Sequence, residues 1–252
     1  MSDLFDLGGK VAVVTGANTG LGQGIALALA KAGAAISLVG RSAPDDTVEK
    51  IEAVGGKSCT VQADLSALDA IDYILKATRD KLGGLDILVN NAGIIQRNEA
   101  LDFTVEEWDS VMNVNLRTLF FLSQAFANSC FDAGHGGKII NIASMLSYQG
   151  GIRVPSYTAS KSGVMGLTRA LANEWASKGI NVNAIAPGYF ATNNTAALQS
   201  DAKRNAEILG RIPAGRWGQP AELGGAAVFL ASSASDYVHG TTLAVDGGWL
   251  SR

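Results

Sequence analysis

The sequence predicts a single α/β domain built on one doubly wound sheet, with about seven parallel strands and helices on both faces. Short apolar runs alternate with helical patterns along the whole chain. The runs read as continuous hydrophobic segments, as strands buried on both faces do. Glycines stand at many of the junctions between strand and helix patterns. No linker or repeat divides the 252 residues, so we expect one domain over residues 1–252.

The first half of the chain supplies four strand patterns and three helix patterns. The strands are predicted at 10–16 (KVAVVTG), 34–40 (AAISLVG), 58–64 (SCTVQAD) and 85–93 (LDILVNNAG). The helices are predicted at 22–33, 45–56 and 67–84, and each pattern ends in glycine, a common helix stop. This alternation requires right-handed crossovers and parallel strands.

The second half continues the same alternation. We predict a long helix over 104–131, a strand at 138–144, a helix over 156–178, a strand at 180–187, a helix over 221–231 and a last strand at 241–248. The polar segment 191–211 is also helix-prone, and we expect residues 189–216 to act as a lid over a substrate. In such folds ligands bind beyond the carboxyl ends of the strands.

The composition excludes several classes of protein. The chain is 47% hydrophobic and 17% charged, so it can bury a core, and its net charge of −3 gives no support for nucleic-acid binding. The two cysteines do not form a disulfide framework. The first residues resemble no signal peptide, and no apolar run approaches a membrane span. We therefore expect a cytoplasmic protein that binds neither nucleic acid nor membrane.

A glycine-rich turn follows the first predicted strand. It reads TGANTGLG, from Thr15 to Gly22, with the spacing GxxxGxG instead of the common GxGxxG. Glycines there let the backbone approach a pyrophosphate, and a helix N-terminus offers free N–H groups and a positive dipole end. The turn predicts a dinucleotide-binding site made by Gly16, Asn18, Thr19, Gly20, Leu21 and Gly22.

Two further strand ends carry polar or small residues. Asp64 and Leu65 follow the third strand, where the carboxylate either accepts a hydrogen bond from adenine or caps the next helix. Asn91, Ala92 and Gly93 follow the fourth strand, where an amide can brace the first strand and small residues let a ribose approach.

The second strand end bears on the choice of nicotinamide cofactor. An acidic residue there would hydrogen-bond the ribose 2′-hydroxyl of NAD and repel a 2′-phosphate. This chain instead has Gly40 followed by Arg41, and an arginine can pair with the phosphate and stack on adenine. The pattern favours NADP(H) over NAD(H), although Asp45 and Asp46 nearby could weaken the positive field.

The ordered set of motifs resembles the short-chain dehydrogenase/reductase family over essentially the whole chain. The set is TGANTGLG, NNAG, Asn115 in NVNL, Ser144 in NIAS, Tyr157 and Lys161 in YTASK, and Pro187-Gly188. The resemblance implies a Rossmann domain, a homotetramer and an oxidoreductase acting on CH–OH groups. It also implies cofactor contacts from Tyr157, Lys161, Pro187, Gly188 and Thr192.

The chemistry of that reaction explains the residue types. Hydride transfer to or from a secondary alcohol or ketone needs a group that moves one proton, and a tyrosine with a pKa of about 10 is a poor base at neutral pH. Lys161 lies one helical turn after Tyr157, and its positive charge would favour the phenolate. Ser144 can hydrogen-bond the reacting oxygen. The resemblance gives Asn115 the role of anchoring a water that links Lys161 to solvent.

The loops point to a polar, acidic substrate. NIASMLSYQGGIRVPSYTASKSGVMG, NVNAIAPGYFATNNT and EILGRIPAGRWGQP are similar to members that act on deoxy and keto-deoxy sugar acids of the 2-deoxy-D-gluconate or 2-keto-3-deoxy-D-gluconate type. A carboxylate calls for arginine, and Arg153, four residues before Tyr157, is the best local candidate. Arg97 follows another strand end, and Arg211 and Arg216 lie on the proposed lid. Further candidate substrate contacts are Met145, Gln149, Asn193 and Asn194.

Two other functions stay open from the sequence. One is reduction of another polar carbonyl, such as a 3-ketoacyl thioester or a polyol. The other is a non-catalytic dinucleotide-binding regulator, which would not need a phenolate.

His135 and His239 lack metal-ligand neighbours, so we expect no metal site. Trp217 and Trp249 are expected to pack within the protein rather than stack on a cofactor. Without a partner subunit to cover them, Trp249 and Leu250 at the chain end would form an exposed apolar patch.

Overall fold

The computed structural model describes residues 3–252, and its centre is a sheet of seven parallel strands in the order β3-β2-β1-β4-β5-β6-β7. The strands are β1 (Val11–Thr15), β2 (Ala35–Gly40), β3 (Ser58–Gln62), β4 (Ile87–Asn90), β5 (Gly137–Ile142), β6 (Ile180–Pro187) and β7 (Thr242–Val245). The order reverses between β1 and β4, which is where doubly wound folds bind ligands. The predicted fold class is confirmed.

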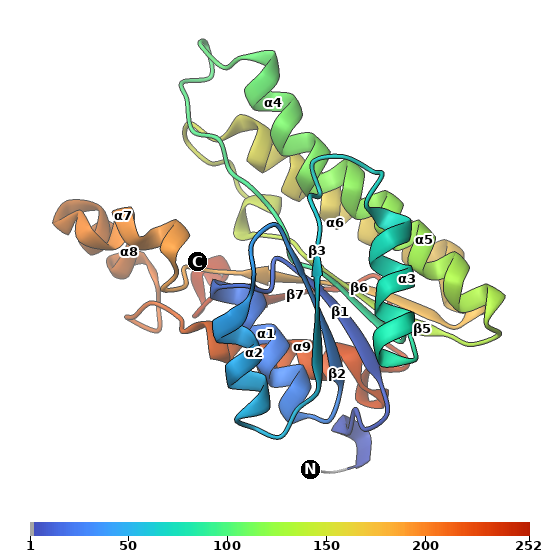
Figure 1. Cartoon of the computed structure of the whole chain (residues 1–252). Helices are drawn as coiled ribbons and strands as arrows, with labels where there is room; N and C mark the ends of the chain where they lie inside the picture. Colours follow the sequence, from blue (N-terminus) through green and yellow to red (C-terminus); the bar gives the residue numbers. More distant parts are fainter. Residues whose placement is uncertain (1–2) are drawn as a thin grey trace.

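Helices cover both faces of the sheet (Figure 1). They are α1 (Gly20–Lys31), α2 (Asp45–Glu52), α3 (Ile71–Leu82), α4 (Val105–Met112), α5 (Leu119–Asp132), α6 (Pro155–Trp175), α7 (Ala196–Ser200), α8 (Ala202–Arg211) and α9 (Gly224–Ala231). One core packs α1, α2 and α9 against the sheet, and a second packs α3, α5 and α6 against the opposite face. Along β1, Val13 belongs to one core while Ala12 and Val14 belong to the other, so the strand is buried on both sides.

Two predicted helical segments are interrupted. The helix expected over 104–131 is α4, a π-helical segment at Asn113–Thr118 and then α5. The helix-prone segment 191–211 contains a short 3₁₀ turn at Asn193–Thr195 followed by two helices, α7 and α8. Asp201 separates α7 from α8, because its side chain accepts hydrogen bonds from the backbone N–H groups of Lys203 and Arg204 and starts a new helix. Helical periodicity shows neither break.

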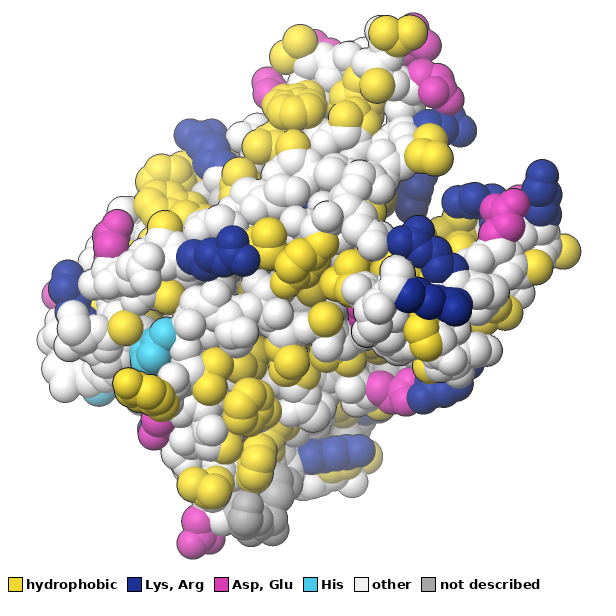
Figure 2. All heavy atoms as spheres, turned by 180° about the vertical axis from the view of Figure 1, so that it is seen from behind, with side chains coloured by type: hydrophobic (Ala, Val, Ile, Leu, Met, Phe, Trp, Pro, Cys, Tyr) yellow, Lys and Arg dark blue, Asp and Glu magenta, His cyan; other side chains and the backbone are white. Residues whose placement is uncertain are grey.

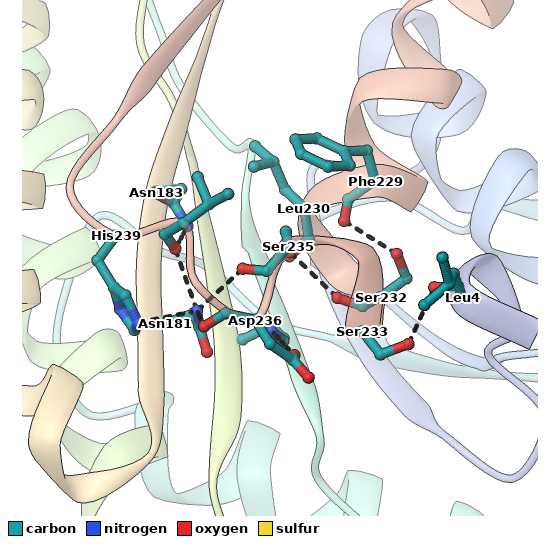
Figure 3. Close-up of polar contacts among 12 residues, drawn as sticks. Leu4, Asn181, Asn183, Phe229, Leu230, Ser232, Ser233, Ser235, Asp236 and His239 are labelled. Carbon is teal, nitrogen blue, oxygen red and sulfur yellow. Dashed lines mark hydrogen bonds and ion pairs between the residues drawn. The ribbon is translucent and has the colours of Figure 1, made fainter.

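The loop between α9 and β7 is held to β6 by asparagine side chains (Figure 3). The amide nitrogen of Asn181 donates to the carbonyl oxygens of Ser235, Asp236 and Val238 at 3.0–3.2 Å. Asn183 donates to Val238 O and accepts from Thr241 N just before β7 begins. These contacts position the last strand beside β6. No helix among residues 3–252 is both long and apolar enough to cross a bilayer.

We predict that Asn181→Ala lowers the free energy of unfolding by about 2 kcal/mol, because the carbonyl oxygens of Ser235 and Asp236 lose the donor that holds this loop to β6. Urea denaturation measures the change. Asn128→Ala is the matched control, since Asn128 is exposed on α5 and its replacement should change stability by less than about 0.5 kcal/mol. Equal losses in the two variants would contradict the role given to Asn181.

Candidate active site

The polar residues singled out by sequence lie at one edge of the sheet, where β1, β4, β5 and β6 are consecutive neighbours. Each strand ends there in one of the motifs: TGANTGLG after β1, NNAG at β4, Ser144 after β5 and Pro187-Gly188 at β6. Parallel strands put all their carboxyl ends on the same side. Segments more than 100 residues apart in the chain therefore converge on one site.

The turn after β1 is packed against the end of β4. The Asn91 side chain donates to the carbonyl oxygens of Thr15 and Gly16 at 2.9 and 3.1 Å, and the Thr15 hydroxyl accepts from the N–H groups of Asn91 and Ala92. A Cβ on Gly22 would lie 2.1 Å from Gly16 O, so no larger residue fits. The amide at Asn91 thus braces the first strand, as its position suggested.

The start of α1 has the form of an anion cradle. Thr19 precedes the helix with an extended backbone, and its exposed side chain makes no capping hydrogen bond. The first N–H groups of α1 therefore have no side-chain acceptor among the described residues, and the glycine backbone leaves the approach open. The residues fit a dinucleotide pyrophosphate at this turn. Thr192 lies close by, since a Cβ on Gly20 would be 3.5 Å from its methyl group.

The end of β2 is open and basic. A Cβ on Gly40 would meet only Ser42 O and Asn18 Oδ1, at 3.8 and 4.0 Å, and Asn18 donates to the Ser42 hydroxyl at 2.8 Å. Arg41 is exposed, and its side chain forms no ion pair with any residue from 3 to 252. Asp46 is bound by Lys50 at 2.6 Å and by Gln23 at 2.8 Å, and these contacts lower its pKa. The Asp46 charge is thus matched locally by Lys50.

Asp64 is exposed after β3 and accepts a hydrogen bond from the backbone N–H of Ser66 at 2.9 Å. This bond lowers the pKa of Asp64, and the nearby charge of Arg41 acts in the same direction. The alternative of a helix cap is wrong, because α3 begins only at Ile71 and Ala70 precedes it. Leu65 is buried beside Asp64 and belongs to the core under α3 and α5.

Ser144, Tyr157 and Lys161 lie together beyond the end of β5. Ser144 follows β5, and its hydroxyl accepts from Leu146 N at 3.1 Å. Tyr157 and Lys161 are one turn apart on α6, which Pro155 starts, and Lys161 Nζ lies 5.6 Å from the centre of the Tyr157 ring. Lys161 is 4% exposed and donates to Ile142 O at 2.5 Å. The arrangement holds a buried cation next to a phenol.

Burial controls the protonation of both α6 residues. It raises the pKa of Tyr157, while a hydrogen bond with the Ser144 side chain and the charge of Arg97 act in the opposite direction. Burial lowers the pKa of Lys161 to about 8. Both shifts favour the uncharged side chain, so ionisation of Tyr157 depends on the charges brought next to it.

Asn115 connects the end of β4 to α6. Its side chain is fully buried, accepts from Ile94 N at 2.8 Å and donates to Ile94 O at 2.9 Å and to the Ser160 hydroxyl at 3.2 Å. Ser160 in turn donates to the backbone oxygen of Tyr157. Asn115 lies in the π-helical segment, a distortion common at functional sites. Ser160 was not among the predicted site residues, although it stands inside YTASK between Tyr157 and Lys161.

Two of the arginines proposed for a carboxylate, Arg97 and Arg153, have different surroundings. Arg153 has a left-handed backbone with φ of 65°, and its Nε atom pairs with Glu99 Oε1 at 3.0 Å. Arg97 is exposed, has no ion pair within the described part of the chain, and lies near enough to Tyr157 to lower its pKa. Of the two, Arg97 is therefore the unpaired cation whose charge reaches Tyr157.

The other substrate candidates divide between the active-site loop and the proposed lid. Met145 is buried against Ile208, Ile212 and Trp249. Gln149 is half-buried, with its side-chain oxygen bound by Trp249 Nε1 at 2.9 Å and by Arg211 Nη2 at 3.3 Å. Asn193 and Asn194 are exposed where the chain enters α7.

Two expectations about the tryptophans have opposite outcomes. Trp217 and Trp249 pack against Tyr189 with ring centres 5.4 and 4.8 Å apart, which agrees with a packing role. The prediction of an exposed patch at Trp249-Leu250 is wrong, because Trp249 is 6% exposed and packs beneath the end of α8.

Within residues 3–252 no three His, Cys, Asp or Glu side chains are grouped to hold a metal ion.

Comparison with known proteins connects this site to a reaction class. Residues 16–250 match a family model described as enoyl-(acyl carrier protein) reductase. The chain is 61% identical over 248 residues to a 2-dehydro-3-deoxy-D-gluconate 5-dehydrogenase of Escherichia coli (strain K12), covering 98% of both chains. It is 56% identical over 254 residues to an enzyme of the same name from Bacillus subtilis (strain 168), covering 100% of this chain and 99% of that one.

Solved structures show the same fold with a cofactor bound. A protein of Agrobacterium tumefaciens, provisionally named a 2-deoxy-D-gluconate 3-dehydrogenase and crystallised with NADP, is 57% identical with a TM-score of 0.94, and both chains are fully covered. A gluconate 5-dehydrogenase from Burkholderia cenocepacia J2315, solved with NADP and tartrate, is 40% identical with a TM-score of 0.93, covering 99% of this chain and 98% of that one.

The lowered pKa of Lys161 predicts a pH dependence of stability. Between its folded value of about 8 and its ordinary value of 10.5, the unfolded chain holds a proton that the folded protein has released. Stability should therefore rise with pH across this window. Relative to Lys161→Met, we expect the wild-type protein to gain up to roughly 3 kcal/mol between pH 8 and 10.5.

Urea denaturation of the cofactor-free protein at several pH values measures this difference. Lys57→Met is the control, because Lys57 is exposed. A wild-type advantage that stays constant, or that falls with pH, would show that Lys161 is not held in an environment that disfavours its charge.

Proposed function

The chain belongs to the short-chain dehydrogenase/reductase family, and we propose that it transfers a hydride between NADP(H) and a secondary alcohol or ketone of a deoxy or keto-deoxy sugar acid. The observation that carries the proposal is the pair formed by Tyr157 and buried Lys161, next to Ser144 and the glycine turn at one sheet edge. A non-catalytic regulator would not need this arrangement.

The proton steps belong to this chain's own residues. In oxidation, the Tyr157 phenolate accepts the hydroxyl proton of the substrate alcohol. A bound nicotinamide would supply the acceptor for the hydride. Ser144 donates a hydrogen bond to the reacting oxygen and holds it beside Tyr157. Protonated Lys161 favours the phenolate and would hold the cofactor ribose, and ketone reduction runs the proton transfer in reverse.

Asn115 acts through its neighbours. Its amide binds Ile94 N and Ile94 O and donates to Ser160 on α6. Asn115 therefore holds the loop after β4 against the helix that carries Lys161. The family resemblance adds the proposal that Asn115 anchors a water through which Lys161 exchanges protons with solvent.

The substrate proposal rests on charge and on the relatives. Arg97 is exposed close to Tyr157, and a guanidinium is suited to a carboxylate. The relatives at 56–61% identity carry the name 2-dehydro-3-deoxy-D-gluconate 5-dehydrogenase, and the Burkholderia structure contains tartrate, itself a hydroxy acid. The family model's description points to acyl thioesters instead. A polar lid and an exposed arginine favour the sugar acid.

Segment 189–216 is proposed as the substrate lid. Its helices α7 and α8 project from the sheet and the helices that cover it (Figure 1). Lys and Arg side chains gather on and beside this projecting segment (Figure 2). The segment contains four basic residues, Lys203, Arg204, Arg211 and Arg216, against two acidic ones, Asp201 and Glu207. Arg204 and Arg216 pair with Glu207 and Glu222, so Lys203 and Arg211 are the cations that can attract an anionic substrate.

NADP(H) is the proposed cofactor, with NAD(H) as the second possibility. Gly40 leaves room for a 2′-phosphate and Arg41 offers it an unpaired cation, while Asp46 is occupied by Lys50. Three structural relatives were solved with NADP. We also propose a cytoplasmic location, since an enzyme that uses NADP(H) on a small metabolite suits that compartment.

A homotetramer is also proposed from the family resemblance. The outer strand β7 is an open sheet edge, and Tyr237, in the loop before it, is completely exposed. Tyr148 is exposed as well, and its hydroxyl lies 3.4 Å from Thr242 O on β7. An open edge with exposed aromatic side chains suits contact with another copy of the chain.

Tyr157→Phe is expected to lower kcat by about 10²- to 10⁴-fold, because the proton carrier is lost while the ring stays in place. Steady-state assays should use 2-keto-3-deoxygluconate and 2-deoxygluconate, with a 3-ketoacyl thioester as the competing substrate class, each with both nicotinamides. Turnover at the wild-type rate in the variant would disprove the mechanism. Good thioester activity without sugar-acid activity would remove the substrate proposal.

Arg41→Ala should raise KM for NADP(H) about tenfold and KM for NAD(H) less than about twofold. Only NADP(H) has a 2′-phosphate that pairs with the Arg41 guanidinium. Arg79→Ala is the control, since Arg79 is an exposed arginine on α3 and should leave both values unchanged. Equal effects of Arg41→Ala on the two cofactors would rule out pairing with the phosphate.

A further inference from the structure

Gln149 belongs to the same tight turn as Ser144. The 3₁₀ turn Met145–Ser147 begins directly after Ser144, and the backbone N–H of Gln149 donates to Met145 O at 3.1 Å. The turn is also anchored to α6, because the Ser147 hydroxyl donates to Lys161 O at 2.6 Å. Gln149 is therefore held at a fixed place relative to the reacting groups.

The orientation of the Gln149 amide follows from its two partners. Its side-chain oxygen accepts from Trp249 Nε1 at 2.9 Å and from Arg211 Nη2 at 3.3 Å. An indole and a guanidinium can only donate hydrogen bonds, so the atom facing them must be the oxygen. Turning the amide over would lose both bonds and set its NH₂ group against two donors. The NH₂ group is therefore directed away from Trp249 and Arg211, and it has no partner among the described residues.

The two donors are themselves fixed by the end of the chain. The Arg211 guanidinium stacks on the Trp249 ring at 4.0 Å. Arg252 donates to the carbonyl oxygens of Arg211 and Gly210 at 3.2 and 2.8 Å. Residue 214 is tied to the same tail by a backbone bond from Ala214 N to Gly247 O. The last residues of the chain thus join the end of α8 to the turn that carries Ser144.

We propose that Gln149 is a specificity-determining donor and that Trp249 and Arg211 are the positioning residues that orient it. The inference rests on the proposed function: the Gln149 NH₂ group donates to an oxygen of the sugar acid, while the C-terminal residues keep the amide from turning. An acceptor oxygen, in a keto or carboxylate group, is the chemistry that this donor recognises. Arg211 comes from α8, so contact between the lid and the Ser144 turn is part of the same arrangement.

The test measures KM and kcat for 2-keto-3-deoxygluconate, together with NADP(H) affinity by fluorescence titration. Trp249→Phe keeps the ring but removes the indole N–H. We expect it to raise KM for the sugar acid about fivefold to tenfold, with a smaller change in kcat and no change in NADP(H) affinity. Trp108→Phe on α4 is the matched control and should change none of these values.

Coupling to Gln149 separates orientation from general packing. In a Gln149→Ala background, Trp249→Phe should change KM by less than about twofold, because there is no amide left to orient. The same increase of KM in both backgrounds, or no increase in the wild-type background, would overturn the proposal. A merely structural tryptophan would raise KM whether or not Gln149 were present.

Gln149→Glu tests the donor directly and does not depend on the folding of a tryptophan variant. A glutamate still accepts from Trp249 and Arg211 but presents an oxygen where the NH₂ group was. We expect KM for the sugar acid to rise more than about tenfold with unchanged NADP(H) affinity. Wild-type KM in this variant would overturn the proposal. A wild-type enzyme without sugar-acid turnover would instead refute the proposed function, so the two failures are distinguishable.

Discussion

The buried amide of Asn115 is the contact on which the geometry of the site depends. It binds the backbone N–H and C=O of Ile94 beyond β4 and donates to Ser160 on α6. These bonds fix the position of the helix that carries Tyr157 and Lys161 relative to the sheet edge. A polar amide at zero exposure is tolerated only because its bonds are made. The π-helical segment between α4 and α5 contains this side chain.

Below the edge, a second set of polar bonds supports the same strands. Asn90 donates to Ser123 on α5 and to Asn141 on β5, and Asn141 donates to Thr168 on α6. Together with Asn91, which binds the turn after β1, these side chains link three neighbouring strands. Such fully paired networks make an edge rigid enough to orient a phenol, a hydroxyl and an ammonium toward one substrate atom.

Sequence patterns predicted the sheet, its parallel strands and most helix positions, because hydrophobic runs and glycine stops are local signals. They also predicted that Asn91 would brace the first strand. Local patterns missed the break of the 104–131 helix, where the π-helical segment buries two polar residues, Asn115 and Thr118. They favoured Arg153 as the carboxylate-binding arginine, because nothing in the neighbouring sequence indicates that Glu99 pairs with it.

The fold class, the glycine turn and the one-turn spacing of Tyr157 and Lys161 follow from the sequence alone, because each depends on residues close together in the chain. The environments of the site residues follow from how the chain packs in three dimensions. This packing buries Lys161 and lowers its pKa, leaves Arg97 free near Tyr157, and places Trp249 under α8 instead of on the surface. Burial and partner choice arise from contacts between distant segments, and packing alone sets which of those contacts form.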